Sequence, residues 1–275
     1  MIYPPPDELL ALGPIFVGGD TCSYFRDGRP ARTAYAQPFR QISDAAYDKA
    51  LNLGMRRSGE LLYRPICPGC RKCQPFRVDT QRFQPSKSQR RVIRKCEGRF
   101  EIRMHNPRVD AEHIELFAKY QQMQHPGRGI EPSETSYRGF LGESAIPGTR
   151  ELSWRDPQGK LCAVGIIDLL PSGLSTVYFF WDPDLRDLSL GTYSALAEID
   201  LCRQWGRRYY YLGYLVPGAA TMNYKASFDA GEVWDGTDWI PLPARGLEDP
   251  EVIALLAQAE RKSMQADARR FPSPK

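Results

Sequence analysis

Three cysteines stand at three-residue intervals, and this spacing is the first sign of chemistry in the sequence. Cys67, Cys70 and Cys73 can bring several thiolates to one soft metal ion, with Cys22 as a fourth ligand. The alternative is a reduced turn in which the thiols pack as small hydrophobic groups. A disulfide framework is not expected, because the seven cysteines occur in a chain without secretory features. A metal bound here would be structural or regulatory.

Basic residues are concentrated in one part of the chain. Residues 56–99 contain thirteen Lys or Arg and three acids, a net charge of +10. The whole chain carries only +4, so the remainder carries −6. A basic block of this size on an otherwise acidic protein indicates that the protein binds a polyanion.

Residues 86–96 are predicted to form a helix, since Ser86 and Gln89 have the spacing of a capping box. Its cations fall within an arc of about 140°, and its apolar side chains lie on the other side. The cations are Lys87, Arg90, Arg91, Arg94 and Lys95. Such a run can be a solvated face. We favour phosphate binding, because five cations on one arc repel each other without an anionic partner.

The order of elements predicts an α/β (α+β) fold. Residues 1–100 form a small N-terminal domain with short strands, the Cys cluster and the basic helix, although residues 1–14 are Pro-rich and expected to be irregular. Residues 101–243 follow the order of the Gcn5-related acyltransferase fold. The elements predicted there are a helix at 111–123, strands at 150–154, 161–170 and 174–181, a helix at 189–206 and a strand at 209–212. Residues 244–275 are expected to be a helical tail with a loose end.

Composition and the absence of apolar runs bound the class of protein. The chain is 42% hydrophobic and 25% charged, which is typical of globular proteins. No run of about 18 apolar residues occurs, and the first ten residues lack the basic and apolar regions of a signal peptide. We therefore expect a soluble, cytoplasmic protein.

Several motifs occur in a fixed order along residues 15–235. They are Arg56-Arg57-Ser-Gly-Glu-Leu-Leu-Tyr-Arg-Pro65, Cys67-Pro-Gly-Cys70, Phe83-Gln-Pro-Ser-Lys-Ser-Gln-Arg-Arg91, Ser189-Leu-Gly-Thr-Tyr193, Tyr211-Leu-Gly-Tyr214 and Met222-Asn-Tyr-Lys-Ala226. Together they resemble the signatures of the arginyl-tRNA–protein transferase superfamily. The Cys-Pro-Gly-Cys-x-x-Cys form resembles its bacterial aspartate/glutamate leucyltransferase branch.

The resemblance implies an aminoacyltransferase that moves leucine from leucyl-tRNA to the N-terminal Asp or Glu of acceptor proteins, which marks them for degradation. It implies leucyl-tRNA and these proteins as partners, without a membrane. An aminoacyl ester is already activated, so transfer needs a positioned amine, a proton acceptor and oxyanion donors, but no cofactor. The superfamily's reported zinc or iron–sulfur site would use the Cys cluster, although Phe25 replaces the second cysteine that would follow Cys22.

The chemistry of such a transfer, which needs a proton acceptor and oxyanion donors, suggests catalytic residues. Catalytic candidates are Asp182, which follows a predicted strand, and the hydroxyls of Tyr211 and Tyr214. Asp182 can accept the amine proton, or it can be a turn residue before Pro183. The cysteines are not expected to supply a nucleophile.

An acidic acceptor needs a cation for its carboxylate. Candidates for acceptor binding are Arg56, Arg57, Tyr224 and Lys225. Lys225 can instead be a surface residue, and Arg57 a structural ion-pair partner. Acyltransferases of this fold hold a pyrophosphate at a helix N-terminus, and a tRNA 3′ end can use the same amides. The residues at that helix start are Ser189, Gly191 and Thr192.

Three alternative functions stay open at this stage. The donor can be arginyl-tRNA, since motifs do not reveal the shape of the donor pocket. The protein can be a coenzyme A-dependent N-acetyltransferase, although Arg186-Asp-Leu-Ser-Leu-Gly191 does not match the usual coenzyme A motif. It can also be a non-catalytic RNA-binding protein, in which case the polar motifs of the second domain would have no use.

Overall fold

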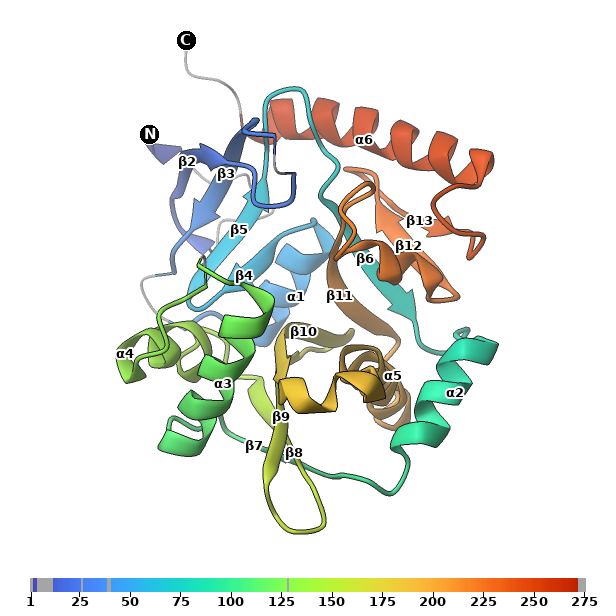
Figure 1. Cartoon of the computed structure of the whole chain (residues 1–275). Helices are drawn as coiled ribbons and strands as arrows, with labels where there is room; N and C mark the ends of the chain where they lie inside the picture. Colours follow the sequence, from blue (N-terminus) through green and yellow to red (C-terminus); the bar gives the residue numbers. More distant parts are fainter. Residues whose placement is uncertain (1, 4–11, 26, 39–40, 128, 272–275) are drawn as a thin grey trace.

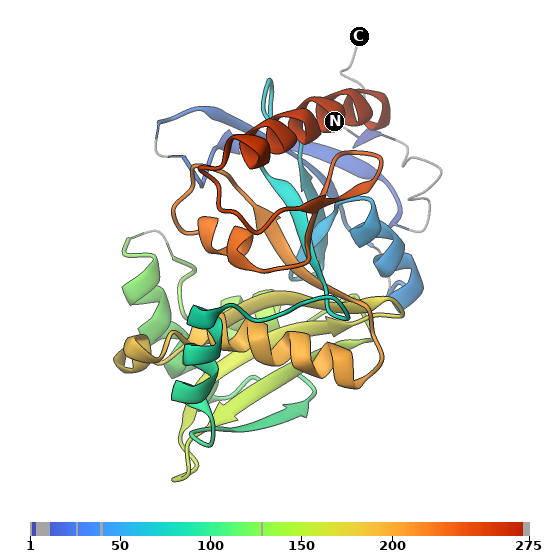
Figure 2. The same ribbon diagram turned by 90° about the vertical axis from the view of Figure 1, so that its right-hand side faces the viewer.

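The computed structural model describes residues 2–3, 12–25, 27–38, 41–127 and 129–271. Most of the start that we expected to be irregular, and residues 272–275 of the end that we expected to be loose, lie outside these described residues. The protein contains a five-stranded and an eight-stranded sheet. Figures 1 and 2 show the small sheet in the upper half of the molecule, with the last helix lying across the top of the molecule. In the described part of the chain, no helix has the length and apolar character needed to cross a membrane.

The small sheet is antiparallel throughout and has the strand order β1-β2-β3-β5-β4. Its strands are β1 (Ile2–Tyr3), β2 (Ile15–Thr21), β3 (Pro30–Ala36), β4 (Arg56–Ser58) and β5 (Leu61–Pro65). Helix α1 (Asp44–Asn52) precedes β4, and Ser43 caps it by accepting from the amide of Ala46. Gly54 then adopts φ +83°, so the chain can turn sharply from the helix into β4.

The large sheet has the order β13-β12-β6-β11-β10-β9-β8-β7. Its strands are β6 (Gln74–Asp79), β7 (Glu101–His105), β8 (Thr149–Arg155), β9 (Leu161–Leu169), β10 (Gly173–Trp181), β11 (Tyr209–Leu215), β12 (Gly231–Trp234) and β13 (Trp239–Leu242). The pair β10 and β11 is parallel, and the other neighbours are antiparallel. The predicted strands of the second domain are confirmed.

Helices cover both faces of this sheet (Figure 1). The α-helices are α2 (Lys87–Cys96), α3 (Ala111–Gln124), α4 (Glu134–Tyr137), α5 (Leu190–Gln204) and α6 (Pro250–Arg270), with short turns η2 (Arg138–Gly142), η3 (Pro183–Leu188) and η4 (Asn223–Ser227). Alternate residues of β9 face opposite sides: Val164 packs in the cluster of α3, and Ala163 packs in the cluster of α5.

The order β8, β9, β10, α5, β11 agrees with the predicted acyltransferase-like fold, and the α/β class is confirmed. The large sheet also takes in β6, which comes before residue 100, and α2 packs on α5. The two sheets therefore do not divide at residue 100. The domain limits at residues 100 and 243 stay predictions.

The predicted tail is a 21-residue helix that is fastened to the small sheet. Asp267 of α6 is buried and accepts from Arg64 at 2.9 Å and from Arg71 at 2.7 Å. Arg71 lies between two cysteines of the Cys cluster, so this ion-pair network joins α6 to that loop as well as to β5.

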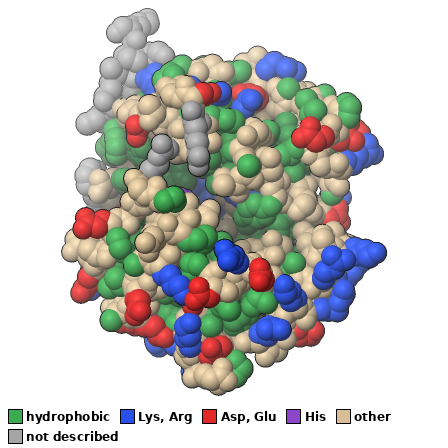
Figure 3. All heavy atoms as spheres, in the orientation of Figure 1, with side chains coloured by type: hydrophobic (Ala, Val, Ile, Leu, Met, Phe, Trp, Pro, Cys, Tyr) green, Lys and Arg blue, Asp and Glu red, His purple; other side chains and the backbone are tan. Residues whose placement is uncertain are grey.

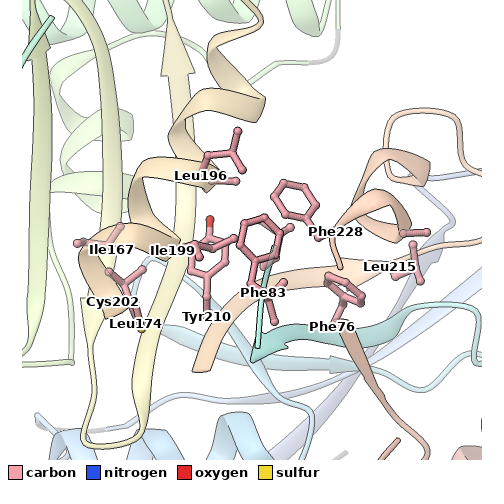
Figure 4. Packing of buried hydrophobic residues seen from close by; sticks show 14 of the residues in the cluster. Phe76, Phe83, Ile167, Leu174, Leu196, Ile199, Cys202, Tyr210, Leu215 and Phe228 are labelled. Carbon is pink, nitrogen blue, oxygen red and sulfur yellow. The ribbon is translucent and has the colours of Figure 1, made fainter. Parts of the chain in front are cut away.

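The main core lies between α5, β11 and the segment that leads into α2 (Figure 4). Phe76, Phe83 and Phe228 line one side, and Leu196 and Ile199 of α5 line the other. Burial of such side chains stabilises the fold by about 1.5–3 kcal/mol each. This packing sets α5 firmly over β10 and β11.

Candidate active site

Strands β10 and β11 part soon after they begin to pair, and the opening between them is the centre of the candidate site. They pair only over residues 173–175 and 209–211, and each strand then carries a bulge. The next carbonyl of β10, that of Thr176, accepts a hydrogen bond from Nη2 of Arg56. Open α/β sheets bind ligands where neighbouring strands diverge beyond their carboxyl ends.

Two buried cations, Arg56 and Lys225, lie together here, and we call these two side chains the cationic pocket. Within the described part of the chain, neither has a carboxylate partner. Arg56 is 6% exposed, and its Nη1 has no hydrogen-bond partner among the described residues. Lys225 is equally buried, and its Nζ donates to the carbonyl of Tyr214 at 2.8 Å. Burial, followed by repulsion from Arg56, lowers the pKa of Lys225 to about 7. Buried charges without a counter-ion are unfavourable, so the cationic pocket favours an incoming anion.

The backbone of β11 makes room for Lys225. Gly213 sits at the bulge with φ +91°, a conformation that favours glycine. A Cβ at this position would lie 3.3 Å from Nζ of Lys225. Any other residue at 213 would therefore strain the strand and press on the ammonium group.

Three tyrosines wall the cationic pocket. The rings of Tyr63 and Tyr214 meet edge to face with centroids 5.8 Å apart, and Tyr24 packs in the same cluster. Burial raises the pKa of Tyr24 and of Tyr214 well above the usual range, so both hydroxyls stay protonated at neutral pH. The Tyr214 hydroxyl donates to the carbonyls of Gly54 and Tyr63, 3.2 Å from each. Tyr214 was expected to be a catalytic residue. In the structure it lies beside the cationic pocket, and its hydroxyl is bound to backbone carbonyls.

Tyr211, the other tyrosine expected to be catalytic, lies outside the cationic pocket. Its hydroxyl lies 3.0 Å from Oδ1 of Asn52 and 3.1 Å from the hydroxyl of Ser172. Its ring packs in the core cluster around α1. The structure therefore does not bring Tyr211 and Tyr214 together at one reacting centre.

Asp182, the expected proton acceptor, caps η3 and belongs to an ion-pair cluster. It is 2% exposed and binds Lys119 and Lys160, the latter at 2.8 Å. Burial opposes ionisation, but the hydrogen bonds from the two lysines outweigh it and lower the pKa of Asp182 to about 2. A carboxylate with so low a pKa is a weak base, so this geometry fits the alternative that Asp182 is a structural turn residue.

Arg57 was expected to bind the acceptor, but in the structure it is already paired. Arg56 and Arg57 are neighbours on β4, so their side chains point to opposite faces. Arg57 donates to both oxygens of the buried Asp168, at 2.6 and 2.7 Å, and also to Thr149 and to the carbonyl of Gly59. Its charge is balanced, so the cationic pocket consists of Arg56 and Lys225 without Arg57.

Glu198 is a buried acid that the sequence interpretation missed. It is fully buried on α5 and accepts from Ser194 at 2.6 Å and from the Tyr210 hydroxyl at 2.9 Å. Figure 4 shows this hydroxyl pointing from β11 toward α5. Burial raises the pKa of Glu198 to about 7. The signal that could have revealed it is an acid four residues after a serine on the apolar side of the predicted helix.

Tyr224 and the residues at the start of α5 also belong to the predicted site. Tyr224 is 42% exposed as a whole residue, but its hydroxyl is buried. This burial, followed by the nearby Glu198 carboxylate, raises the pKa of Tyr224 to about 12. Ser189 precedes α5 with φ 56° and makes no side-chain cap. The backbone amides of Thr192 and Tyr193 both donate hydrogen bonds to the carbonyl of Ser189. Left-handed backbone at a non-glycine residue is strained and often marks functional positions.

The basic helix is two-sided, as predicted. All five of its cations are exposed, and Figure 3 shows them as a blue group on the right side of the molecule. Its capping box is present, since the Ser86 hydroxyl and the Gln89 side chain each bond the other's backbone amide. Cys96 is buried, and Val92 and Ile93 pack against the main core.

Cys22, Cys67, Cys70 and Cys73, the possible metal ligands, are all free thiols. The Cys67 thiol lies 3.4 Å from the Arg32 amide, from which it accepts, and donates to the Arg32 carbonyl. Burial, followed by Cys67, Cys70 and Cys22, raises the pKa of Cys73. Among the residues described, no three His, Cys, Asp or Glu are grouped to hold a metal ion. As arranged, these residues do not fit a metal site, and we derive no step from one.

The strand order and the opening beside α5 define a protein of the acyltransferase-like class. Its sequence matches two family models, arginine-tRNA-protein transferase, N terminus, over residues 20–91 and arginine-tRNA-protein transferase, C terminus, over residues 112–235. The chain therefore belongs to the arginine-tRNA-protein transferase family.

Relatives within this family confirm the predicted resemblance. The chain is 37% identical over 221 residues to the aspartate/glutamate leucyltransferase of Saccharophagus degradans, covering 80% of this chain and 92% of the relative. It is 40% identical over 227 residues to the aspartate/glutamate leucyltransferase of Chromohalobacter salexigens, and this match covers 80% of this chain and 90% of the relative.

The chain is also similar to two solved structures at low sequence identity. L-PGS from Bacillus licheniformis is 12% identical with a TM-score of 0.39, and the match covers 75% of this chain and 70% of that one. FemX is 9% identical with a TM-score of 0.39, and the match covers 72% and 79%.

Proposed function

We propose that this protein is an aminoacyl-tRNA–protein transferase that moves leucine from leucyl-tRNA to the N-terminal Asp or Glu of acceptor proteins. The observation that carries the proposal is the cationic pocket, two buried cations without a carboxylate partner at the opening between β10 and β11. An acidic first residue supplies the missing anion, and a neutral one does not. The relatives named aspartate/glutamate leucyltransferase support both leucine as donor and an acidic acceptor.

The chemistry is the attack of an amine on an ester that is already activated. Arg56 and Lys225 hold the acceptor's side-chain carboxylate, which places its α-amine at the opening. The aminoacyl end of the tRNA enters beside the start of α5, where helix amides favour phosphate oxygens. The exposed cations of α2 bind the phosphate backbone farther along the tRNA. Positioning of amine and ester supplies most of the rate acceleration.

Two other functions make different demands on this site. Transfer from arginyl-tRNA would leave the cationic pocket unchanged and alter only the donor side. A coenzyme A-dependent N-acetyltransferase would use the start of α5 for a pyrophosphate and would need no basic helix. The family membership and the exposed cations of α2 favour a tRNA donor.

An assay with matched peptides tests the proposal. Peptides that start with Asp, Asn, Glu, Gln, Lys or Arg are incubated with leucyl-tRNA, arginyl-tRNA or acetyl coenzyme A, and product is measured by mass. We expect leucine on the Asp and Glu peptides, with Asn and Gln transferred about ten- to a hundredfold less efficiently. Transfer to Lys or Arg peptides, or acetylation from coenzyme A, would contradict the proposal.

The basic helix gives a prediction about tRNA affinity. The double variant Arg90→Glu, Arg94→Glu should weaken leucyl-tRNA binding by about tenfold or more and reduce the slope of log K against log salt by about one to two. With fewer phosphate contacts, binding of the tRNA releases fewer counter-ions and therefore depends less on salt. The matched control is Arg261→Glu, Arg269→Glu, which reverses two exposed cations on α6. Equal slopes for the two double variants would rule out α2 as the tRNA surface.

A further inference from the structure

Glu198 is a buried acid that has no cationic partner among the residues the structure describes, and Thr176 lies between it and the cationic pocket. The contacts that act on Glu198 come from the hydroxyls of Ser194, Tyr210 and Thr176, and no Lys or Arg is among them. Thr176 lies between the two sites, because its carbonyl accepts from Arg56 and its side chain is close enough to Glu198 and Tyr210 to lower the pKa of both. Opposite buried charges are thus held on the two sides of one partly exposed threonine.

This arrangement matches the charges of an acidic N-terminal residue. Such a residue carries a side-chain carboxylate and, a few bonds away, an α-ammonium group. Resting on the proposed function, we propose that Glu198 receives the proton of the acceptor's α-ammonium group through the hydroxyl of Thr176. Glu198 does not touch the substrate and is a positioning and proton-relay residue, whereas Thr176 borders the opening directly.

The proton steps balance as follows. The α-ammonium group gives one proton to the Thr176 hydroxyl, which passes its own proton to Glu198. The neutral amine attacks the ester carbonyl carbon, a C–N bond forms, and the C–O bond to the ribose oxygen breaks. The second amine proton goes to that oxygen, so the tRNA leaves with a free hydroxyl and a new amide remains. Glu198 then returns its proton to solvent through the same threonine.

The surroundings of Glu198 suit this role. A base works best when its pKa is near the working pH, and that of Glu198 is about 7. The titratable groups that face it are Tyr210 of β11 and Tyr224 of η4, and burial raises the pKa of both. They stay neutral at the working pH and do not compete for the proton. Ser194 and Tyr210 fix the carboxylate in one orientation.

The test is the pH profile of kcat with an Asp-initiated peptide and leucyl-tRNA. Glu198→Gln should lower kcat by about 100-fold near pH 7. The deficit should shrink toward pH 8.5, where an α-amine with a pKa of about 8 loses its proton without help. KM for the peptide should stay close to that of the wild type. Asp200→Asn, an exposed carboxylate on the same helix, should match the wild type at every pH.

Variants at Thr176 provide a second, independent readout. Thr176→Val should reproduce the pH-dependent loss, and Thr176→Ser, which keeps the hydroxyl, should restore most of the activity. A deficit that is equal at all pH values, or a Thr176→Val variant with wild-type kcat, would overturn the relay. Absence of transfer by the wild-type protein would instead overturn the proposed function.

Discussion

Replacement of Lys225 by methionine should lower kcat/KM for an Asp-initiated peptide by about ten- to a hundredfold. The value for the matched Asn-initiated peptide should stay unchanged. Methionine is unbranched like lysine and only one atom shorter, and it removes the charge that pairs with the acceptor's carboxylate. Arg56→Gln should have the same effect, since both cations belong to the cationic pocket. Initial rates for the two peptides at equal leucyl-tRNA concentration give the comparison.

The control is Lys262→Met, which removes an exposed lysine of α6 that pairs with Asp235 in the turn between β12 and β13. It should leave the preference for Asp over Asn intact. If Lys225→Met loses activity toward both peptides equally, Lys225 acts on the shared chemistry and the cationic pocket does not select the acceptor.

The same variant should reveal that Lys225 links stability to pH. Its pKa is about 7 in the folded protein and 10.5 in an ordinary lysine, so in this interval the unfolded chain binds more protons. The free energy of unfolding of the wild type therefore rises with pH between these values. Lys225→Met should be the more stable protein below pH 7, and its advantage should shrink as the pH rises. Urea unfolding at several pH values measures this difference.

Local signals in the sequence predicted the elements well. The capping box at Ser86 and Gln89 fixed the start of α2, and the alternation of charged and apolar residues fixed its two sides. The order of strands and helices after residue 109 predicted the acyltransferase-like half of the large sheet. These features depend on residues that are close in the chain, which is why periodicity and capping predict them.

The roles of single side chains were harder to predict because they depend on distant partners. Arg56 and Arg57 are adjacent and equally buried, yet only Arg57 meets a carboxylate, that of Asp168, 111 residues later. Asp182 follows a strand as expected, but lysines from two other segments bind it. Glu198 looks in the sequence like any other acid on a helix, because its partner Tyr210 comes from a separate strand, β11. No pattern within one segment contains this information.

The pairing of Arg57 with Asp168 leads to the largest expected change in stability. Arg57→Gln and Asp168→Asn should each lower the free energy of unfolding by about 3–5 kcal/mol, because each leaves a buried charge without its partner. The pair also joins β4 of the small sheet to β9 of the large one. Its loss should therefore loosen the contact between the sheets. Urea unfolding followed by tryptophan fluorescence measures the loss.

The double replacement Arg57→Met, Asp168→Leu separates the effect of an unpaired buried charge from the effect of losing the packing contact between the two side chains. Removing both charges and filling the space with apolar groups is often neutral or stabilising, so this variant should recover most of the loss seen in the single variants. Arg103→Gln provides the contrast, since Arg103 and Glu101 form a pair that is 64% and 58% exposed, and it should show no measurable change. If the double variant is as unstable as the single ones, the hydrogen bond of Arg57 to Thr149 of β8 holds the sheets together. In that case the ion pair itself would contribute little, and Thr149→Val alone should reproduce much of the effect.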